Sequence, residues 1–374
     1  MKVLFTCGGT GGHINPALAV AKMLRAKRPE CEILFVGATG GMETQLIPQE
    51  GFEIKTIDIE GVSRKFTFAG MKHNISVFRK VLTSGMKARK ILRDFNPDVV
   101  MGTGGYACFP ILKAASKLKI PTIIHEANAY PGLVTRTLGA KLTRVLVNFD
   151  ATKDYLKYNH NIKTIGMPVR QDILFKDKSE ARAELGIDER PLVVSFFGSL
   201  GAREMNKAMA EFIKLECETG LFNHIHAMGK FGSEWMPNLI AEKGIVLHEH
   251  PDIDLREYIH DMPRVMAAAD VIICRGGAST VSEIAAAGKP AIIIPSPNVA
   301  ENHQEKNAKV LSDIGGAFML RESEVTGKSI YDKVCEIAFD GEKLKDMSKN
   351  LSKVAILDGC ERIYKEIAEL AKKS

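Results

Sequence analysis

Short apolar runs recur along the chain, separated by longer segments in which apolar residues follow helical spacing. The runs have the length of buried strands, and strands that alternate with helices favour a parallel sheet covered by helices on both faces. Helices are expected between most of the strands, beginning with Ile14–Lys27. The strands expected in the first half are Val3–Cys7, Glu32–Val36, Glu53–Ile57, Asp98–Gly102, Thr122–His125, Arg144–Asn148 and Lys163–Ile165.

The same pattern restarts after Gly166. A strand at Pro191–Phe197 is followed by a glycine turn and a helix over Arg203–Thr219, which repeats the arrangement at the N-terminus. Further strands are expected at Ile225–Met228, Ile245–His248, Val271–Cys274, Ala291–Pro295 and Ala317–Leu320. We therefore expect an α/β protein of two Rossmann-like, doubly wound domains that face each other across a cleft. The expected boundaries are 1–166 and 167–352, with a C-terminal helix at 353–374 that packs back on the N-terminal domain.

Five predicted strands are followed by glycine-rich or polar clusters. The clusters are Gly8–His13, Thr103–Tyr106, His125–Asn128, Gly198–Arg203 and Arg275–Glu283. Open α/β sheets bind their ligands outside the carboxyl ends of the strands, where these clusters fall. Turn chemistry alone would account for one or two of them, so the pattern predicts ligand sites.

The first cluster combines four glycines with a histidine. The glycines would let backbone amides approach an anion closely, and the following helix start adds partial positive charge. His13 adds a titratable group at the same place. A tight turn with a solvated histidine is the alternative, and both interpretations stay open at this point. The spacing excludes the dinucleotide fingerprint, because Ile14 stands where a third glycine is required.

The cluster that ends in Glu283 has two interpretations. Its first residues would offer backbone amides to a diphosphate, and Glu283 would accept hydrogen bonds from a ribose. Alternatively, Thr280 and Glu283 form a capping box at the helix start, which the local sequence favours. Both interpretations involve the same segment, Ala278, Ser279, Thr280, Val281, Ser282 and Glu283.

Two more polar groups allow similar alternatives. His125, Glu126 and Asn128 end a predicted strand, and they either recognise sugar hydroxyls or an acyl amide or form a structural loop. His125 is a second candidate for a general base. Gln304 and Asn307 open a helix and either donate to sugar hydroxyls or cap that helix.

Composition narrows the function classes. The chain has 374 residues, 26% of them charged, and seven scattered cysteines without a C-x-x-C motif, so we expect reduced thiols and no zinc site. The chain opens on a strand, so no signal peptide is expected. No apolar run approaches the roughly 20 residues that a membrane-spanning helix needs.

Charge is distributed unevenly along the chain. The net charge of +6 combines +12 in residues 1–168 with −6 in residues 169–374. A basic stretch over 64–93 includes Phe66 and Phe68, which lack helical spacing, and the loop Val62–Met71 therefore favours contact with an anionic membrane surface. For the segment Ile75–Phe95 an ordinary amphipathic helix is the favoured interpretation. No nucleic-acid-binding module is recognised, so we expect no nucleic-acid partner.

Taken together, the motifs resemble a known family. They read GGTGGH, MGTGGY, HEAN, GMPVR, FGSLGAR, YIHDM, CRGGASTVSEIAAAGKP and NHQEKNA, in order from residue 8 to residue 307. This set is similar to the glycosyltransferases of peptidoglycan synthesis that convert lipid I to lipid II. Those enzymes move N-acetylglucosamine from UDP onto undecaprenyl-diphospho-muramoyl-pentapeptide.

The resemblance implies a GT-B fold and an inverting transfer that forms a β-1,4 linkage without a metal or other cofactor. It implies that His13 is the base or an acceptor ligand, with Tyr106, His125 and Glu126 on the acceptor side. The residues that it implies for UDP-N-acetylglucosamine are Thr10, Gly11, Gly12, Asn128, Arg170, Ser199, Ile259, Ala278, Ser279, Thr280, Val281, Ser282, Glu283 and Gln304.

The implied partners are UDP-N-acetylglucosamine, lipid I and the anionic inner face of the cell membrane, with the protein peripheral on its cytoplasmic side. A glycolipid transferase acting on diacylglycerol and a UDP-sugar epimerase share this fold and are alternatives. A non-catalytic module that binds a nucleotide sugar is a third.

Overall fold

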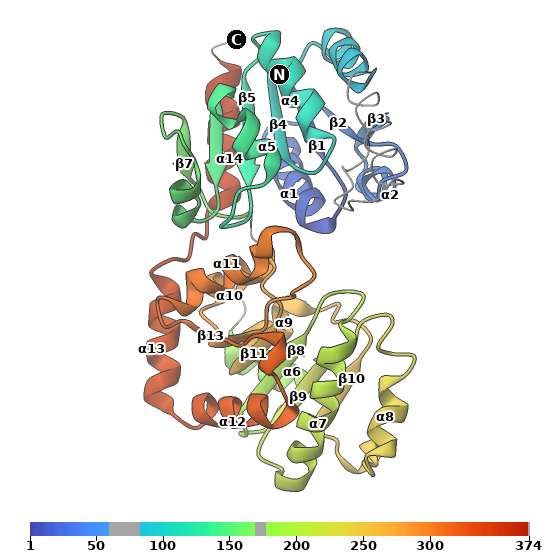
Figure 1. Ribbon diagram of the computed structural model, residues 1–374, viewed down its shortest axis with the longest axis vertical. Coiled ribbons are helices and arrows are strands. Elements are labelled where there is room, and N and C mark those ends of the chain that lie inside the picture. Colours follow the sequence, from blue (N-terminus) through green and yellow to red (C-terminus); the bar gives the residue numbers. More distant parts are fainter. Residues whose placement is uncertain (60–82, 169–176, 373–374) are drawn as a thin grey trace. The chain divides into compact units, whose positions relative to one another are not determined.

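The computed structural model describes residues 1–59, 83–168 and 177–372, and the chain forms two compact units. Unit 1 comprises Met1–Pro168 together with Asp358–Ser374, and unit 2 comprises Val169–Leu357 (Figure 1). Each unit contains one sheet in which every pairing is parallel. The expected α/β, doubly wound class is confirmed.

Unit 1 has a seven-stranded sheet in the order β3-β2-β1-β4-β5-β6-β7. The strands are β1 (Lys2–Cys7), β2 (Glu32–Ala38), β3 (Glu53–Ile57), β4 (Val99–Gly104), β5 (Thr122–Glu126), β6 (Arg144–Val147) and β7 (Ile162–Thr164). Strand β1 lies between β2 and β4, with Leu4 opposite both Leu34 and Val100. Because helices cover both of its faces, β1 is apolar at nearly every position instead of alternating.

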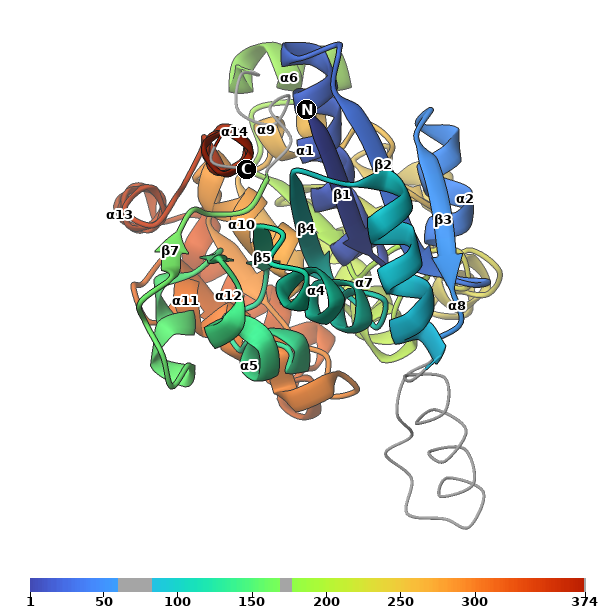
Figure 2. The ribbon, with the colours of Figure 1, turned by 90° about the horizontal axis from the view of Figure 1, so that it is seen from above.

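Helices pack on both faces of this sheet. Phe5 and Phe35 stack on one face at 5.2 Å between ring centroids, in the cluster that includes Ile14 of α1. Leu4 faces the opposite side, in a cluster that includes Ile111 of α4. Figure 2 shows α1 and α14 on one side of the sheet and α4 and α5 on the other. The helices are α1 (Gly11–Lys27), α2 (Glu43–Gln49), residues 83–95, α4 (Cys108–Lys117), α5 (Leu133–Leu138) and α14 (Gly359–Ala371).

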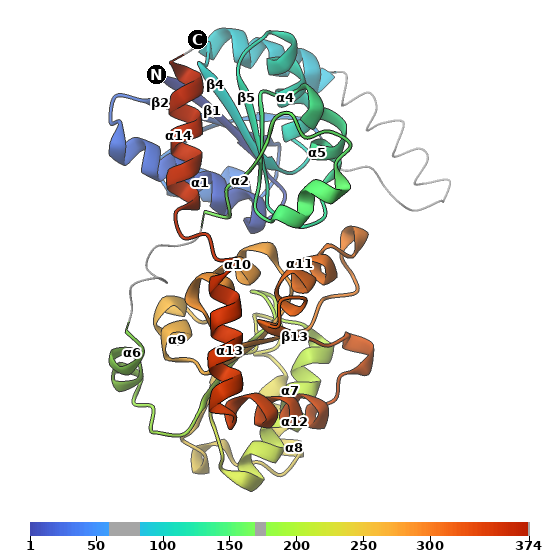
Figure 3. The ribbon, with the colours of Figure 1, turned by 90° about the vertical axis from the view of Figure 1, so that its left-hand side faces the viewer.

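Helix α14 is distant in sequence but packs in the core of unit 1 beside α1 (Figure 3). Its buried residues Ile363, Ile367 and Leu370 share a cluster with the first strand and first helix. On its polar side, Glu366 pairs with Arg144 at 3.2 Å and with Lys163 at 2.5 Å. The helix therefore completes one layer of the unit.

Unit 2 has a six-stranded sheet in the order β10-β9-β8-β11-β12-β13. The strands are β8 (Leu192–Phe196), β9 (Asn223–Ala227), β10 (Ile253–Arg256), β11 (Val271–Cys274), β12 (Ala291–Ile293) and β13 (Ala317–Met319). The strand order reverses between β8 and β11, and ligands of doubly wound folds bind beside such a reversal.

The helices of unit 2 also form two layers. Helices α7, α8 and α12 bury Phe212, Ile240 and Val334 in one cluster. Helix α9 packs with α6, and α10 packs with α11 and α13. The helices are α6 (Lys178–Leu185), α7 (Arg203–Thr219), α8 (Met236–Glu242), α9 (Met262–Ala268), α10 (Ala278–Ala287), α11 (His303–Ser312), α12 (Gly327–Ala338) and α13 (Gly341–Ser352). None of the described helices is long and apolar enough to span a membrane.

One expected strand, Ile245–His248, is wrong. Its residues lead into a short 3-10 turn at Leu247–Glu249, and the strand lies further on, at Ile253–Arg256. Strand β10 is at the edge of the sheet, where the described residues supply a partner strand on one side alone, and there Arg256 pairs with Asp254 at 2.6 Å. An edge strand does not require a continuous apolar run, so its polar residues hid it from the pattern.

Candidate functional site

The glycine-rich loop of unit 1 runs from the end of β1 into α1. Thr10 is the N-cap of α1 in extended conformation, and its side chain makes no capping hydrogen bond. Gly9, Thr10 and Gly12 are exposed. A helix start with exposed residues and no side-chain cap is suited to an anion or a polar ligand group.

His13 lies in the first turn of α1 and is linked to the loop after β4. Its Nδ1 is 3.1 Å from the carbonyl oxygen of Thr103, and the Thr103 hydroxyl donates to the His13 carbonyl oxygen at 2.6 Å. Because a carbonyl only accepts, Nδ1 carries the proton of the neutral ring and Nε2 is its basic nitrogen. The pair of contacts fixes both the backbone and the ring of His13.

The second glycine loop of unit 1 is pressed against the first. Gly104 has φ +117°, and a Cβ at this position would overlap the imidazole of His13. Gly105 has φ +91°, and a Cβ there would overlap the carbonyl oxygen of Gly8. Tyr106 follows with 58% of its surface exposed. The two loops therefore pack so closely that only glycine fits where they touch.

His125 is buried rather than exposed. Only 1% of its surface is accessible, and its Nε2 donates to the carbonyl oxygen of Gly166 at 2.9 Å. Burial lowers the pKa of His125 to about 4. Its Nδ1 has no hydrogen-bond partner among the described residues. His125 is therefore a neutral histidine in the core that holds the end of unit 1's sheet.

Glu126 organises its own loop. Its carboxylate accepts hydrogen bonds from the backbone amides of Asn128 (3.1 Å) and Gly132 (2.8 Å) and from the hydroxyl of Thr135 (2.7 Å). Burial raises the pKa of Glu126, and these hydrogen bonds oppose that shift. Glu126 therefore fits the interpretation of this cluster as a structural loop. Asn128 is partly exposed, so it is the residue of the cluster that a ligand could reach.

In unit 2 the loop after β8 is held by the loop after β9. The carbonyl oxygen of Ser199 accepts from the backbone amide of Lys230 at 3.0 Å, and the Ser199 residue is exposed. Gly201 has φ +79°, and a Cβ there would overlap the carbonyl oxygen of Met228. Ile259 is buried with 2% of its surface accessible, so it offers its backbone rather than its side chain.

The start of α10 decides between the two interpretations of Glu283. The helix begins at Ala278 after the N-cap Gly277, which makes no side-chain capping hydrogen bond. Thr280 is therefore the third helical residue instead of the cap, and Glu283 lies one turn further on. The capping box that the local sequence favoured is wrong. What remains is a helix N-terminus without an acidic residue in its first turn.

Gln304 and the preceding loop lie against this helix start. A Cβ at Gly276 would overlap the carbonyl oxygen of Gln304, and Asn307 Nδ2 donates to the Gly276 carbonyl at 3.0 Å. Gln304 Oε1 accepts from the backbone amide of Ser296 at 2.8 Å, so the side-chain amide nitrogen of Gln304 points away from that amide. A pocket of about 460 Å³, lined in part by Ser296 and Glu305, adjoins this region.

The structure thus gathers the expected residues of each unit at the carboxyl edge of its sheet. Arg170, the loop Val62–Met71 and the first part of Ile75–Phe95 lie outside the described residues, and residues 83–95 are helical. The sequence analysis missed Glu43, which is wholly buried under the first glycine loop and accepts from the Gly9 amide. Its only signal in the sequence is the glycines around it.

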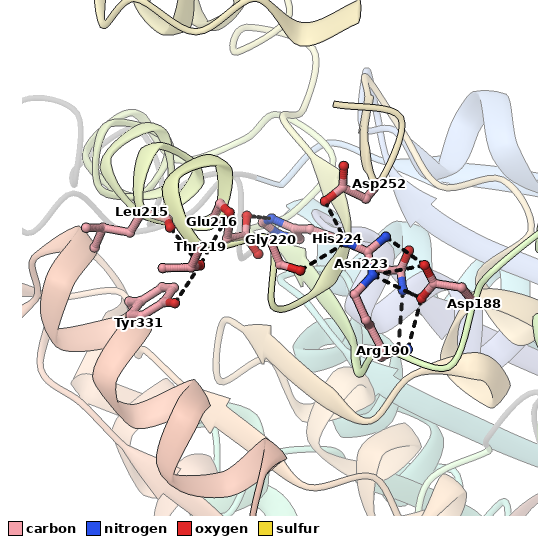
Figure 4. Close-up of polar contacts among 10 residues, drawn as sticks. All are labelled: Asp188, Arg190, Leu215, Glu216, Thr219, Gly220, Asn223, His224, Asp252 and Tyr331. Carbon is pink, nitrogen blue, oxygen red and sulfur yellow. Dashed lines mark hydrogen bonds and ion pairs between the residues drawn. The ribbon is translucent and has the colours of Figure 1, made fainter. Parts of the chain in front are cut away.

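Another acid–histidine pair is unsuited to catalysis. In Figure 4, Glu216 of α7 meets His224 of β9, with Nδ1 2.7 Å from the carboxylate, and both side chains are buried. Asp188, Arg190 and Asn223, which precede or begin the strands, continue this network at the amino edge of the sheet. That edge is opposite the loops described above. The described residues contain no group of three or more His, Cys, Asp and Glu side chains that would hold a metal ion.

Comparisons with known proteins agree with this architecture. Residues 3–147 match the glycosyltransferase family 28 N-terminal domain, and residues 192–363 match the C-terminal domain of the same family. A relative from Acetivibrio thermocellus is 41% identical over all of this chain and 99% of its own length. It is named UDP-N-acetylglucosamine–N-acetylmuramyl-(pentapeptide) pyrophosphoryl-undecaprenol N-acetylglucosamine transferase. A Lactococcus lactis protein of the same name is 36% identical over 99% of this chain and all of its own.

Solved structures add the fold-level likeness. The crystal structure of Acinetobacter baumannii MurG superposes with a TM-score of 0.78 at 27% identity, covering 98% of this chain and 99% of that one. A UDP-N-acetylglucosamine 2-epimerase from Neisseria meningitidis reaches a TM-score of 0.64 at 15% identity, covering the whole of both chains, which is a likeness of fold alone. The chain therefore belongs to glycosyltransferase family 28, among its pyrophosphoryl-undecaprenol N-acetylglucosamine transferases.

Proposed function

We propose that this protein is an inverting hexosyltransferase of peptidoglycan synthesis. It moves N-acetylglucosamine from UDP-N-acetylglucosamine to the C4 hydroxyl of the muramoyl sugar of lipid I, and the product is lipid II. The observation that carries the proposal is the start of α10, where a helix N-terminus follows Gly277 without a capping side chain. The full-length likeness to transferases of this name supports the choice of sugar and acceptor.

Unit 2 binds the donor in this proposal. The amides of Ala278, Ser279 and Thr280 receive the diphosphate at the positive end of α10, and Glu283 accepts from the ribose hydroxyls. The backbone of Ile259 meets the uracil. Ser199 and Arg170 contact the phosphates or the nucleotide. Val281, Ser282 and Gln304 complete the donor residues, with Gln304 directed to a sugar hydroxyl.

Unit 1 supplies the base. The muramoyl C4 oxygen forms a bond to the anomeric carbon while the bond from that carbon to the UDP oxygen breaks. The hydroxyl proton passes to Nε2 of His13, which is the basic nitrogen because Nδ1 donates to Thr103. Thr10, Gly11 and Gly12 hold the sugar or its diphosphate, and Asn128 contacts the donor sugar. Attack on the face opposite UDP inverts the configuration and gives the β-1,4 linkage.

The step needs no metal or other cofactor in this proposal. Negative charge grows on the departing diphosphate, and the α10 N-terminus, Ser199 and Arg170 are the groups assigned to stabilise it. Removing one such preorganised donor typically costs about 10²–10³ in rate. Addition of EDTA tests this assignment, since turnover should persist, and a loss that Mg²⁺ restores would overturn it.

The lipid acceptor requires access to a membrane surface. Among the described residues, a groove of about 330 Å³ between the helix of residues 83–95 and α4 combines Arg89, Lys113 and Lys117 with Met86 and Phe109. Met86 is 64% exposed. Basic and apolar groups together favour an anionic surface. We therefore assign unit 1 to peripheral contact with the inner, cytoplasmic face of the cell membrane.

The deciding experiment offers labelled UDP-N-acetylglucosamine with lipid I, with diacylglycerol or with no acceptor. Label should pass to lipid I alone. Transfer to diacylglycerol would favour the glycolipid transferase, and conversion of the free nucleotide sugar to its C2 epimer would favour the epimerase. Binding of UDP without any product would identify a non-catalytic module.

A further inference from the structure

Glu43 is an acidic side chain with an unusual environment. It is the first residue of α2, and none of its surface is accessible. Its carboxylate accepts a hydrogen bond from the backbone amide of Gly9 at 3.1 Å through Oε2 and another from Ala38 at 2.8 Å through Oε1. Buried carboxylates are rare unless such donors satisfy them. The side chain therefore joins the loop after β1 to the end of β2.

Three glycines make room for this carboxylate. A Cβ at Gly8, at Gly37 or at Gly41 would overlap the Glu43 side chain. These glycines come from three different segments: the loop after β1, strand β2 and the turn before α2. Of the three, none has a positive φ, so the requirement for glycine is one of space and not of backbone conformation.

The contact controls how the first glycine loop is presented. Gly9 has φ +85°, and its amide points to Glu43, so the loop leaves the core at a fixed angle. Thr10 follows directly as the N-cap of α1, and its carbonyl oxygen accepts from the His13 amide at 3.0 Å. On the other side, the Gly8 carbonyl lies against Gly105. The loop that leads into α1 and His13 is thus held in place by two contacts, one with Glu43 and one with the loop after β4.

We propose that Glu43 is a positioning residue for His13, acting through the Gly9 amide and the start of α1. This inference rests on the proposed role of His13 as the base. Glu43 touches no substrate, and its effect is on the placement of Nε2 relative to the acceptor hydroxyl. A misplacement of about 1 Å in such a group costs on the order of 10²-fold in rate.

The test variant is Glu43→Gln. Glutamine has the same shape but one acceptor oxygen, so it turns an amide NH₂ towards Gly9 or Ala38 and loses one of the two backbone contacts. We expect kcat at saturating lipid I to fall about 10- to 100-fold, with KM for UDP-N-acetylglucosamine unchanged. The matched control is Glu50→Gln at the end of the same helix, where Glu50 is partly exposed and pairs with Lys22 at 2.6 Å. Its kcat should match that of the unchanged protein.

A double-mutant comparison separates positioning from general structural damage. If Glu43 acts through His13, Glu43→Gln should cost less than about twofold in a His13→Ala background, because residues that act as a unit are not additive. The same fold-loss in both backgrounds would overturn the inference. Full activity of His13→Ala would instead overturn the proposed role of His13, so the two failures are distinguishable.

A second variant covers the case in which Glu43→Gln does not fold. Glu43→Asp keeps the charge but is one methylene shorter, so it cannot reach both amides. A folded Glu43→Asp protein should show the same loss of kcat with unchanged KM for the donor. Normal kcat in it, or loss of folding in both variants, would assign Glu43 to stability and not to positioning.

Discussion

The start of α10 gives a sharp prediction for Glu283. The perturbation is Glu283→Gln, which keeps the length and one acceptor oxygen of the side chain but removes its charge. Glu283 is the sixth residue of α10, so it lies about 7.5 Å along the axis from Ala278 at 1.5 Å per residue. A side chain at that height does not fold back to cap the helix, and its loss should leave the helix intact.

The magnitudes follow from the two interpretations. A hydrogen bond to a charged acceptor contributes about 1.5–3 kcal/mol, so losing the charge should weaken UDP binding about 10- to 100-fold. Loss of a genuine helix cap costs about 1 kcal/mol. For a domain of the size of unit 2, that loss lowers Tm by about 2–4 °C. We therefore expect weaker donor binding with a Tm change below about 1 °C.

Calorimetric titration with UDP and a thermal scan of the same protein measure both quantities. Thr326→Ala is the matched control, because Thr326 forms a true capping box with Ser329 at the start of α12 in the same unit. It should lower Tm by about 2–4 °C and leave UDP binding unchanged. A Glu283→Gln protein that binds UDP normally and melts several degrees lower would refute the reasoning.

Three further predictions can be checked with simple assays. His13→Ala should lower kcat by about 10² or more while UDP affinity holds in a titration, and near-normal turnover would remove His13 from the mechanism. Burial lowers the pKa of His226 well below its ordinary 6.5, so the unfolded chain takes up a proton that the folded one refuses as the pH falls below 6.5. The free energy of unfolding should then drop by about 1.4 kcal/mol per pH unit because of this group. In urea melts at pH 5 and 7, the free energy of unfolding of His226→Gln should therefore depend less on pH than that of the unchanged protein. The same pH dependence in both proteins would contradict this. Binding of the protein to anionic vesicles, measured by co-sedimentation, should weaken with salt but persist, and Phe66→Ser with Phe68→Ser should abolish the part that persists. A folded double variant that still binds at high salt would contradict this.

The fold was largely predictable from the apolar runs. Val3–Cys7 and Val271–Cys274 are buried on both faces, and continuous apolar sequence is the direct result of that burial. Strand β10 is not evident from the sequence because it pairs with β9 alone at the edge of the sheet, whereas the composition of Ile245–His248 is more typical of a strand. Composition along a short window does not reveal which segment reaches the partner strand.

The site was predictable only where its chemistry is local. Glycines and polar residues directly after strands indicated the loops around His13 and Ser199. The capping box at Thr280 failed because Gly277 starts the helix three residues earlier, which a four-residue pattern does not reveal. Glu43 lies 34 residues from Gly9 in sequence, and only the pairing of β1 with β2 brings them together.

The position of α14 bears on how this chain folds during synthesis. Its residues Ile363, Ile367 and Leu370 pack in the same core as Val3 and Phe5, yet the ribosome makes them after the whole of unit 2. The nascent unit 1 therefore waits with an apolar face uncovered while nearly 190 residues follow it. Unit 2 is contiguous in sequence, so all of its helices have been synthesised once its last residue has left the ribosome. Unit 1 is thus the later of the two to complete its core. Until α14 is made, its uncovered apolar face is the kind of surface that favours aggregation.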